Sequence, residues 1–448
     1  MNFLKTLFVI ALPIILQNFF SSFVNMLDTV MVGQLGSIDI AAVGLANQIF
    51  FVLNIVLFGT VSGGSIFMTQ FWGKKDIQGI HRTMGITIIM SFFVSLVFFS
   101  VAFFAPRFCL SLYTKDYEVI KRGAEYLRCV APSYFFFGIG FAFAHAERSI
   151  ERVKIPMVAT ITSVLLNAVL NYFLIFGIKI GGNQIIPAMG IIGAAIATNI
   201  ARFIEFLILI IIPYACYYEI AAKFSQFFKS QPGFLAKYVR ICLPVLINES
   251  LWGIGQSIQN SIYAHAGTDI IAAFNIQSTI SNLIWTFFIG CGNACAIIIG
   301  KKIGEGEYDE AKKLAKKITF FMIGCAVFAG IFLFPLSMCL KYFFKVEPEV
   351  IHMAQVFLWI AICLYPLWSI GMSMVVGVCR SGGDTIFALI IDVGFMWVVS
   401  LPLGFCAVYF WHLPFWAIYL CVHTEDFLKA TFGLIRLFSG KWLKNVTE

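Results

Sequence analysis

The chain has 448 residues, of which 60% are hydrophobic and only 12% are charged, and it contains 49 phenylalanines. Soluble domains carry roughly 25% charged residues, so this composition excludes an ordinary soluble domain and indicates an integral membrane protein. The formal net charge of +8 arises from Lys and Arg between apolar runs, which reports on membrane topology rather than on nucleic-acid binding.

Long apolar runs separated by polar segments predict membrane-spanning helices rather than barrel strands. Twelve spans follow one another at 6–33, 41–71, 83–106, 123–147, 155–177, 187–216, 237–263, 269–300, 316–342, 351–378, 385–411 and 414–438. Several runs are longer than a bilayer requires, so we expect those helices to tilt, kink or protrude. Most of the Lys and Arg lie on one side of the membrane if both termini are cytoplasmic, which predicts that orientation in the cytoplasmic (inner) membrane.

The two halves of the chain resemble each other. One constant offset aligns Leu12-Pro13 with Leu243-Pro244, and the same offset aligns Ile40-Ala41-Ala42 with Ile271-Ala272-Ala273. Six spans per half is an even number, so the repeats are parallel and related by an axis along the membrane normal.

This repeat predicts the domain organisation. We expect a six-helix bundle over 1–216, a cytoplasmic linker over 217–236 and a second six-helix bundle over 237–448. The linker segment is polar and contains Gln231-Pro232-Gly233, a sequence typical of a turn.

The first span contains an acid among apolar residues. A charged side chain at the bilayer centre costs about 2.5–3.5 kcal/mol or more, so Asp28 is expected to line a water-filled path or to bind a proton or cation. Gln17, Ser21, Asn25 and Asp28 are spaced by three or four residues and therefore share one helix face. This polar face indicates a transport cavity, and a buried acid that is hydrogen-bonded only for packing is the alternative.

The fifth and sixth spans carry polar residues at helical spacing. Asn167 and Asn171 lie four residues apart, and Thr198 lies one turn before Arg202. Arg202 and Glu205 are placed to form an ion pair along the helix. The two Asn and Thr198 could face the acid of the first span and hold a proton or a desolvated Na⁺ with it.

The second half has its own acid, Glu249, about midway along the seventh span. Amide side chains at helical spacing in both halves are expected to line a polar substrate cavity, with hydrogen bonding between packed helices as the alternative. These expected cavity residues are Gln17, Asn25, Asn47, Gln256, Asn260, Asn275 and Asn282.

No motif for catalysis or metal binding accompanies these polar residues. The sequence has no nucleophile elbow, phosphate loop, HExxH motif or carboxylate-rich metal pattern, so it does not indicate an enzyme. The twelve Cys are scattered, mostly within spans, and are typical of small packing residues. We therefore expect no disulfide, no resident metal and no cofactor other than a coupling ion.

Two segments resemble a known family. Residues 11–36 read ALP-(x)14-DTVMVGQLG and residues 379–385 read CRSGGDT. With twelve spans in two halves, they resemble the multidrug and toxic compound extrusion (MATE) family over essentially the whole chain. The resemblance implies a V-shaped pair of bundles, alternating access, and export of cationic or amphipathic organic compounds against inward H⁺ or Na⁺. We expect the protein to act as a monomer in the lipid bilayer and not to bind nucleic acid.

The resemblance also implies a cation site in the first half. In the family an acid on helix one, an Asn and an Asp on helix five, and a Thr on helix six form this site. The corresponding residues here are Asp28, Asn167, Asn171 and Thr198, with Asn171 in place of the second acid. The missing charge argues against tight Na⁺ binding.

A second departure lies in the other half. Glu249 is similar to the helix-seven acid of drug-exporting members, but Ser369 stands where Na⁺-type members have an acid on helix ten. Single carboxylates titrate but coordinate cations incompletely, so H⁺ coupling is favoured over Na⁺.

The sequence therefore predicts a secondary active antiporter in which Asp28 is the coupling group. A flippase of lipid-linked sugars or a metabolite exporter of the same superfamily is an alternative, and a flippase would need cavity cations that the predicted spans mostly lack. A passive channel, which would conduct without a counter-ion, is a third possibility.

Overall fold

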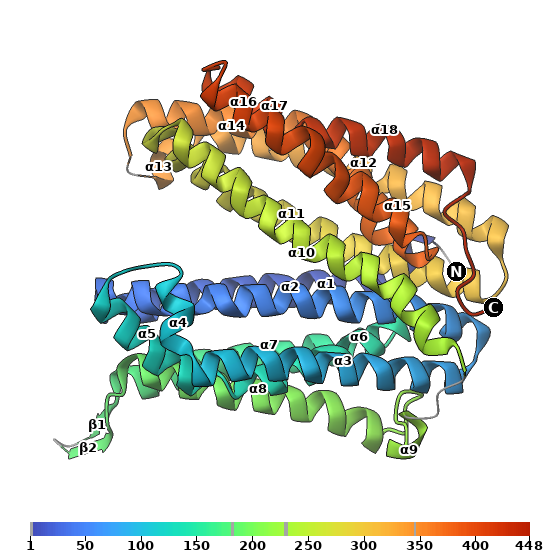
Figure 1. The fold of residues 1–448 in the computed structure, drawn as a ribbon, viewed down its shortest axis with the longest axis horizontal. Helices are drawn as coiled ribbons and strands as arrows, with labels where there is room; N and C mark the ends of the chain where they lie inside the picture. The colour runs from blue at the N-terminus through green and yellow to red at the C-terminus, as the bar shows by residue number, and fades with distance from the viewer. Residues whose placement is uncertain (1–2, 181–182, 228–231, 345) are drawn as a thin grey trace. The chain divides into compact units, whose positions relative to one another are not determined.

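The computed structural model describes residues 3–180, 183–227, 232–344 and 346–448, most of which are helical (Figure 1). The first half forms α1 (Phe3–Gly33), α2 (Ser37–Lys74), α3 (Ile77–Phe104), α4 (Pro106–Ser111), α5 (Tyr117–Val130), α6 (Ser133–Ser149), α7 (Lys154–Phe176) and α8 (Gly190–Ala215). A short antiparallel hairpin, β1 (Ile178–Ile180) and β2 (Asn183–Ile186), connects α7 to α8.

The second half follows the short helix α9 (Phe224–Phe227). It forms α10 (Phe234–Ala266), α11 (Thr268–Gly304), α12 (Tyr308–Met338), α13 (Leu340–Phe343), α14 (Pro348–Met372), α15 (Thr385–Leu389), α16 (Leu401–Tyr409), α17 (Phe415–Val422) and α18 (Thr424–Ser439). Three π-helical stretches interrupt it, namely η1 (Ser373–Cys379), η2 (Ile390–Gly394) and η3 (Met396–Ser400).

The helices confirm the membrane fold class. Among the described residues, nine helices are long and apolar enough to cross a membrane, and the pair α5–α6, bent by 50°, makes a tenth. The more polar helix α10 and the pair α17–α18 complete twelve segments, which follow the predicted spans in order. The bend between α5 and α6 falls beside Pro132, a residue that cannot donate a backbone hydrogen bond.

The chain divides into two compact units. The C-terminal unit comprises Met1–Ile15, Thr69–Lys75 and Lys237–Glu448, and the N-terminal unit comprises Leu16–Met68 and Asp76–Ala236. The helices α1 and α2 therefore contribute residues to both units.

The N-terminal unit is built around α6, α7 and α8, which pack against α3 and α5 (Figure 1). An apolar cluster of this unit includes Leu53 and Leu57 of α2, Leu127 of α5 and Tyr134 of α6, all with at most 1% of their surface exposed. This apolar core holds the polar faces of α7 and α8 in register.

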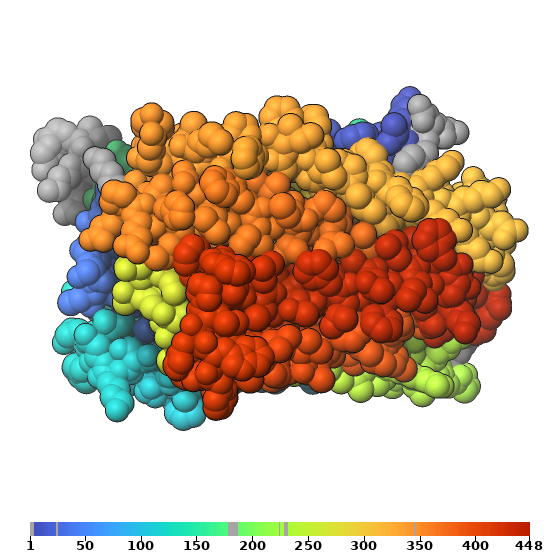
Figure 2. Space-filling view, turned by 90° about the horizontal axis from the view of Figure 1, so that it is seen from above, coloured from blue at the N-terminus to red at the C-terminus, as the bar shows by residue number. Residues whose placement is uncertain are grey.

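In the C-terminal unit, α12, α14 and α18 pack side by side, as Figure 2 shows. The outer face of α12 exposes Phe320, Val327, Phe328 and Ile331. Exposed apolar side chains in such a row are expected where a helix faces lipid.

The end of α2 makes the closest backbone approach in this unit. A Cβ atom on Gly73 would collide with the carbonyl oxygen of Lys301, and one on Gly304 would collide with that of Gln70. Only glycine allows α2 and α11 to approach this closely.

Candidate functional site

Asp28 of α1 lies against two amide side chains of α7 in the N-terminal unit. The Nδ2 of Asn171 donates to Oδ1 of Asp28 at 2.6 Å and to Oδ1 of Asn167 at 3.1 Å. Asn171 is 1% exposed and Asn167 is 7% exposed, whereas Asp28 is half-buried. The three predicted residues therefore come together in one cluster.

The orientation of the Asn167 amide depends on the ionisation state of Asp28, because the atom that accepts from Asn171 is also the one nearest Asp28. One of its two polar atoms lies 3.0 Å from Oδ1 and 3.1 Å from Oδ2 of Asp28. A carboxylate only accepts hydrogen bonds, so the ionised group requires the NH₂ at this position, whereas a protonated carboxyl can donate to the amide oxygen. A rotation of this amide would accompany proton binding.

The sequence of α7 explains why this cluster forms. Thr160, Ser163, Asn167 and Asn171 recur every three or four residues and are all buried, so the buried face of this helix is polar. Ser163 donates to the carbonyl oxygen of Ala201 at 3.0 Å, which joins this face to α8.

Thr198 of α8 lies at the edge of the cluster. Its Oγ1 donates to the carbonyl oxygen of Ala194 at 3.0 Å and lies 3.4 Å from Nδ2 of Asn167. The predicted ion pair on α8 forms, with 2.8 Å between Arg202 and Glu205. Arg202 also acts electrostatically on Asp28, so the cluster contains a fixed cation near its acid.

A chain of buried hydrogen bonds runs beside the cluster. Arg148 donates to Gln17 at 2.6 Å, Gln17 donates to Thr160 at 2.7 Å, and Thr160 donates to Glu205 at 2.7 Å. These bonds link α6, α1, α7 and α8, because each hydroxyl or amide both donates and accepts.

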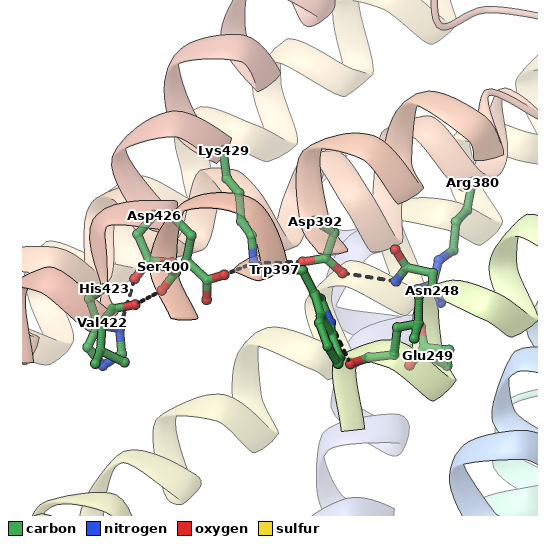
Figure 3. A network of polar contacts seen from close by, with 12 residues as sticks. Asn248, Glu249, Arg380, Asp392, Trp397, Ser400, Val422, His423, Asp426 and Lys429 are labelled. Carbon is green, nitrogen blue, oxygen red and sulfur yellow. Dashed lines mark hydrogen bonds and ion pairs between the residues drawn. The ribbon is translucent and has the colours of Figure 1, made fainter. Parts of the chain in front are cut away.

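The C-terminal unit contains a corresponding chain with more charge, which Figure 3 shows. Arg380, which follows η1, donates to Glu249 of α10. The neighbouring Asn248 donates to Asp392 of η2 at 2.9 Å, and Asp392 pairs with Lys429 of α18 at 2.7 Å.

The two chains occupy equivalent places in the repeat. Arg148 precedes Thr160 by the same number of residues as Arg380 precedes Asp392. In each half the arginine binds a polar residue on the first helix of that half. In the N-terminal copy two of the four side chains are neutral, whereas in the C-terminal copy only Asn248 among the five side chains is neutral.

The expected cavity residues differ in exposure. Gln17 is 7% exposed and takes part in the buried chain. Gln256 is half-buried, and the side chain of Asn25 lies outside the described residues. The exposed members of this set are Asn47, Asn260, Asn275 and Asn282.

Sequence reasoning missed the ion pair between Asp392 and Lys429. Asp392 is the single charged residue of the span 385–411. A lone charge within an apolar span, the signal that identified Asp28, therefore also marks Asp392. Sequence reasoning also gave no partner for Arg148, Arg380 or Lys429. These cations are only 4–8% exposed, and each is buried against a polar partner.

Among the residues that the structure describes, no group of three or more His, Cys, Asp or Glu side chains could hold a metal ion. The Cys side chains are all free thiols.

The chain is similar to known transporters along most of its length. A family model described as MatE matches residues 13–173 and 244–406, once in each half. "Probable multidrug resistance protein NorM" of Thermotoga maritima is 23% identical over 447 residues, which cover 98% of this chain and 93% of the relative. "Probable multidrug resistance protein NorM" of Pasteurella multocida is 28% identical over 420 residues, covering 90% and 85%.

The fold also matches solved structures. A mutant of the Vibrio cholerae MATE transporter VcmN superposes with a TM-score of 0.87 at 18% sequence identity, covering 98% of this chain and 97% of that one.

Proposed function

Because the chain belongs to the MatE family of membrane transporters, we propose that it exports cationic or amphipathic organic compounds in exchange for H⁺ by alternating access. Relatives named as probable multidrug resistance proteins align with 90% or more of its length, which supports this class of substrate. Both termini are proposed to lie in the cytoplasm, with the protein acting as a monomer in the cytoplasmic membrane.

The observation that carries the proposal is the contact between Asp28 and the two amides of α7. Asn171 lies 2.6 Å from the carboxyl group, and the amide of Asn167 lies 3.0 Å from it. An acid held by neutral groups can lose or gain a proton without breaking an ion pair. Such a group is suited to bind a proton on one side of the membrane and to release it on the other.

The surroundings of Asp28 support H⁺ rather than Na⁺. A desolvated Na⁺ would need several oxygen ligands with enough negative charge, and here Asn171 supplies an amide where the family has a second acid. The nearby Arg202 acts electrostatically on Asp28 and would oppose a metal cation. Na⁺ is the alternative coupling ion, and it would be held by Asp28, Asn167, Asn171 and Thr198.

Proton binding would be transmitted through α7. Protonation removes the negative charge of Asp28, and the amide of Asn167 then turns its oxygen toward the new O–H donor. This rotation presents the amide NH₂ to Thr198, 3.4 Å away. The hydrogen bonds between α1, α7 and α8 therefore differ between the two states, which biases a conformational equilibrium.

Glu249 and the amides of the expected cavity are proposed to have separate roles in transport. Glu249 is proposed as a cation-coupling residue of the C-terminal unit. The half-buried amide of Gln256 and the exposed amides of Asn47, Asn260, Asn275 and Asn282 would hydrogen-bond organic substrates, with aromatic residues providing adaptable contacts.

Export of lipid-linked sugars is not favoured. A pyrophosphate group would need cations available in the cavity, but the three Lys and Arg side chains that are buried in the described part of the chain are already paired. Arg148 binds Gln17, Arg380 binds Glu249, and Lys429 binds Asp392.

Transport of a fluorescent organic cation into inside-out proteoliposomes tests the proposal. H⁺ and Na⁺ gradients are imposed separately on the wild type, on Asp28→Asn and on the matched control Glu349→Gln, which changes an exposed acid. We expect a pH gradient alone to drive transport by the wild type and the control, and Asp28→Asn to abolish it. Wild-type transport by Asp28→Asn would refute the role of Asp28, and uptake without any gradient dependence would indicate a channel.

A further inference from the structure

Lys429 of α18 lies between two carboxyl groups in the C-terminal unit. Its Nζ is 2.7 Å from Oδ1 of Asp392 and 3.5 Å from Oε2 of Glu425. Lys429 is 7% exposed and Glu425 is 5% exposed. One buried ammonium group is therefore shared unequally between two acids, and Asp392 takes the shorter contact.

Apart from the 3.5 Å ion-pair contact of Glu425 with Lys429, two buried acceptor atoms of this network have no hydrogen bond within the described part of the chain. They are Oε2 of Glu425 and Oδ1 of Asn248. Asn248 is 3% exposed, and its NH₂ group donates to Asp392. A buried acceptor without a hydrogen bond is costly, so one more hydrogen-bond donor in the cluster would lower that cost.

The backbone is irregular where two of these acids lie. Asp392 lies in the π-helical stretch η2, and Glu425 follows the break between α17 and α18 at His423. π-helical turns are rare and often occur at functional sites. The irregular backbone is thus concentrated where the charged side chains meet.

The charges around Glu425 do not balance. The groups that act on it are Asp392, Asp426, Lys429, His423 and Tyr263. Asp426 pairs with His423 at 3.2 Å, and Lys429 compensates one further acid. The first turn of α18 adds a partial positive charge that Glu425 and Asp426 share.

We propose that Glu425 is a proton-binding site of the C-terminal unit, separate from Asp28, in which Lys429 moves between Asp392 and Glu425. When Glu425 is ionised, Lys429 is shared between both carboxylates. When Glu425 takes a proton from water, Lys429 keeps its own proton and pairs with Asp392 alone. Each cycle binds and releases one proton, and no covalent bond other than O–H changes.

His423 is more exposed than the acids beside it. Its side chain is 26% exposed, whereas Asp426 is 5% exposed. In this proposal the His423 imidazole is the group through which a proton reaches the buried acids. Figure 3 shows His423 and Asp426 on one side of Lys429 and Asp392 on the other.

The test is infrared difference spectroscopy of the purified full-length protein between alkaline and mildly acidic buffer. The background variant Asp28→Asn removes the contribution of Asp28. We expect one carboxylic acid C=O band to appear on acidification, Glu425→Gln to remove it, and Glu425→Asp to keep it at a shifted frequency. The surface control Glu349→Gln should leave it unchanged.

The proposal is overturned if Glu425→Gln retains the band. It is also overturned if Glu425→Asp, which preserves the titrating group, fails to shift it. Because this measurement reports equilibrium proton binding and not transport, its result does not depend on whether Asp28 couples transport.

Discussion

The buried pair of Glu249 and Arg380 gives the most quantitative prediction. Arg380 is 4% exposed and the Glu249 side chain is 13% exposed, and arginine stays protonated in proteins. Glu249→Gln therefore removes the carboxylate and leaves the guanidinium charge in a buried position. Breaking a buried ion pair in this way costs about 3–5 kcal/mol, and we expect the lower end because Glu249 is partly exposed.

A loss of about 3 kcal/mol corresponds to a fall in Tm of about 6–12 °C, at roughly 2–4 °C per kcal/mol for a cooperative unit of 150–250 residues. Thermal unfolding in detergent measures this shift for Glu249→Gln and for the double variant Glu249→Gln/Arg380→Met. Replacing both charges by neutral groups of similar size is often nearly neutral, so the double variant should recover most of the lost stability.

The outcome separates two roles of Glu249. A Tm unchanged by Glu249→Gln, together with lost transport, would refute the structural argument and support Glu249 as a coupling residue. If the double variant is as unstable as Glu249→Gln, the unpaired charge of Arg380 is not the cause of the lost stability.

Three further substitutions test other parts of the structure. Asn171→Asp places a second carboxylate beside Asp28, and we expect a Na⁺ gradient, measured with a fluorescent cation in proteoliposomes, to drive transport that it does not drive in the wild type. Gly304→Leu pushes a side chain against the backbone of Gln70. The overpacking should lower the free energy of unfolding by about 1–3 kcal/mol, seen as a lower Tm, whereas an unchanged Tm would contradict the close approach. Trp442→Ala removes a fully buried side chain and should cost about 3–5 kcal/mol in thermal unfolding, an expectation that an unchanged Tm would disprove.

The order and extent of the helices could be predicted because membrane spans are encoded locally. The predicted span 155–177, for example, corresponds to α7 (Lys154–Phe176). In a bilayer every backbone polar group must be bonded within its own helix, so a long apolar run has few alternatives. The bend between α5 and α6 was not predicted, although Pro132 lies inside the predicted span 123–147 and proline interrupts a helix.

The candidate site was partly predictable for a similar reason. The spacing of Asn167 and Asn171 fixes one face of α7, and resemblance to the family connected that face with Asp28. The pairing of Asp392 with Lys429 depends on which helices become neighbours, which periodicity does not specify. A lone lysine near a chain end is interpreted as a topology signal until its partner is known.

The most direct test of the central claim is substrate-triggered proton release. A pH-sensitive dye is trapped in proteoliposomes in Na⁺-free buffer, and an organic cation is added on the side from which it is transported. We predict that the wild type moves protons in the opposite direction to the cation and that Asp28→Asn does not. Cation transport by the wild type without any accompanying proton movement would contradict the account.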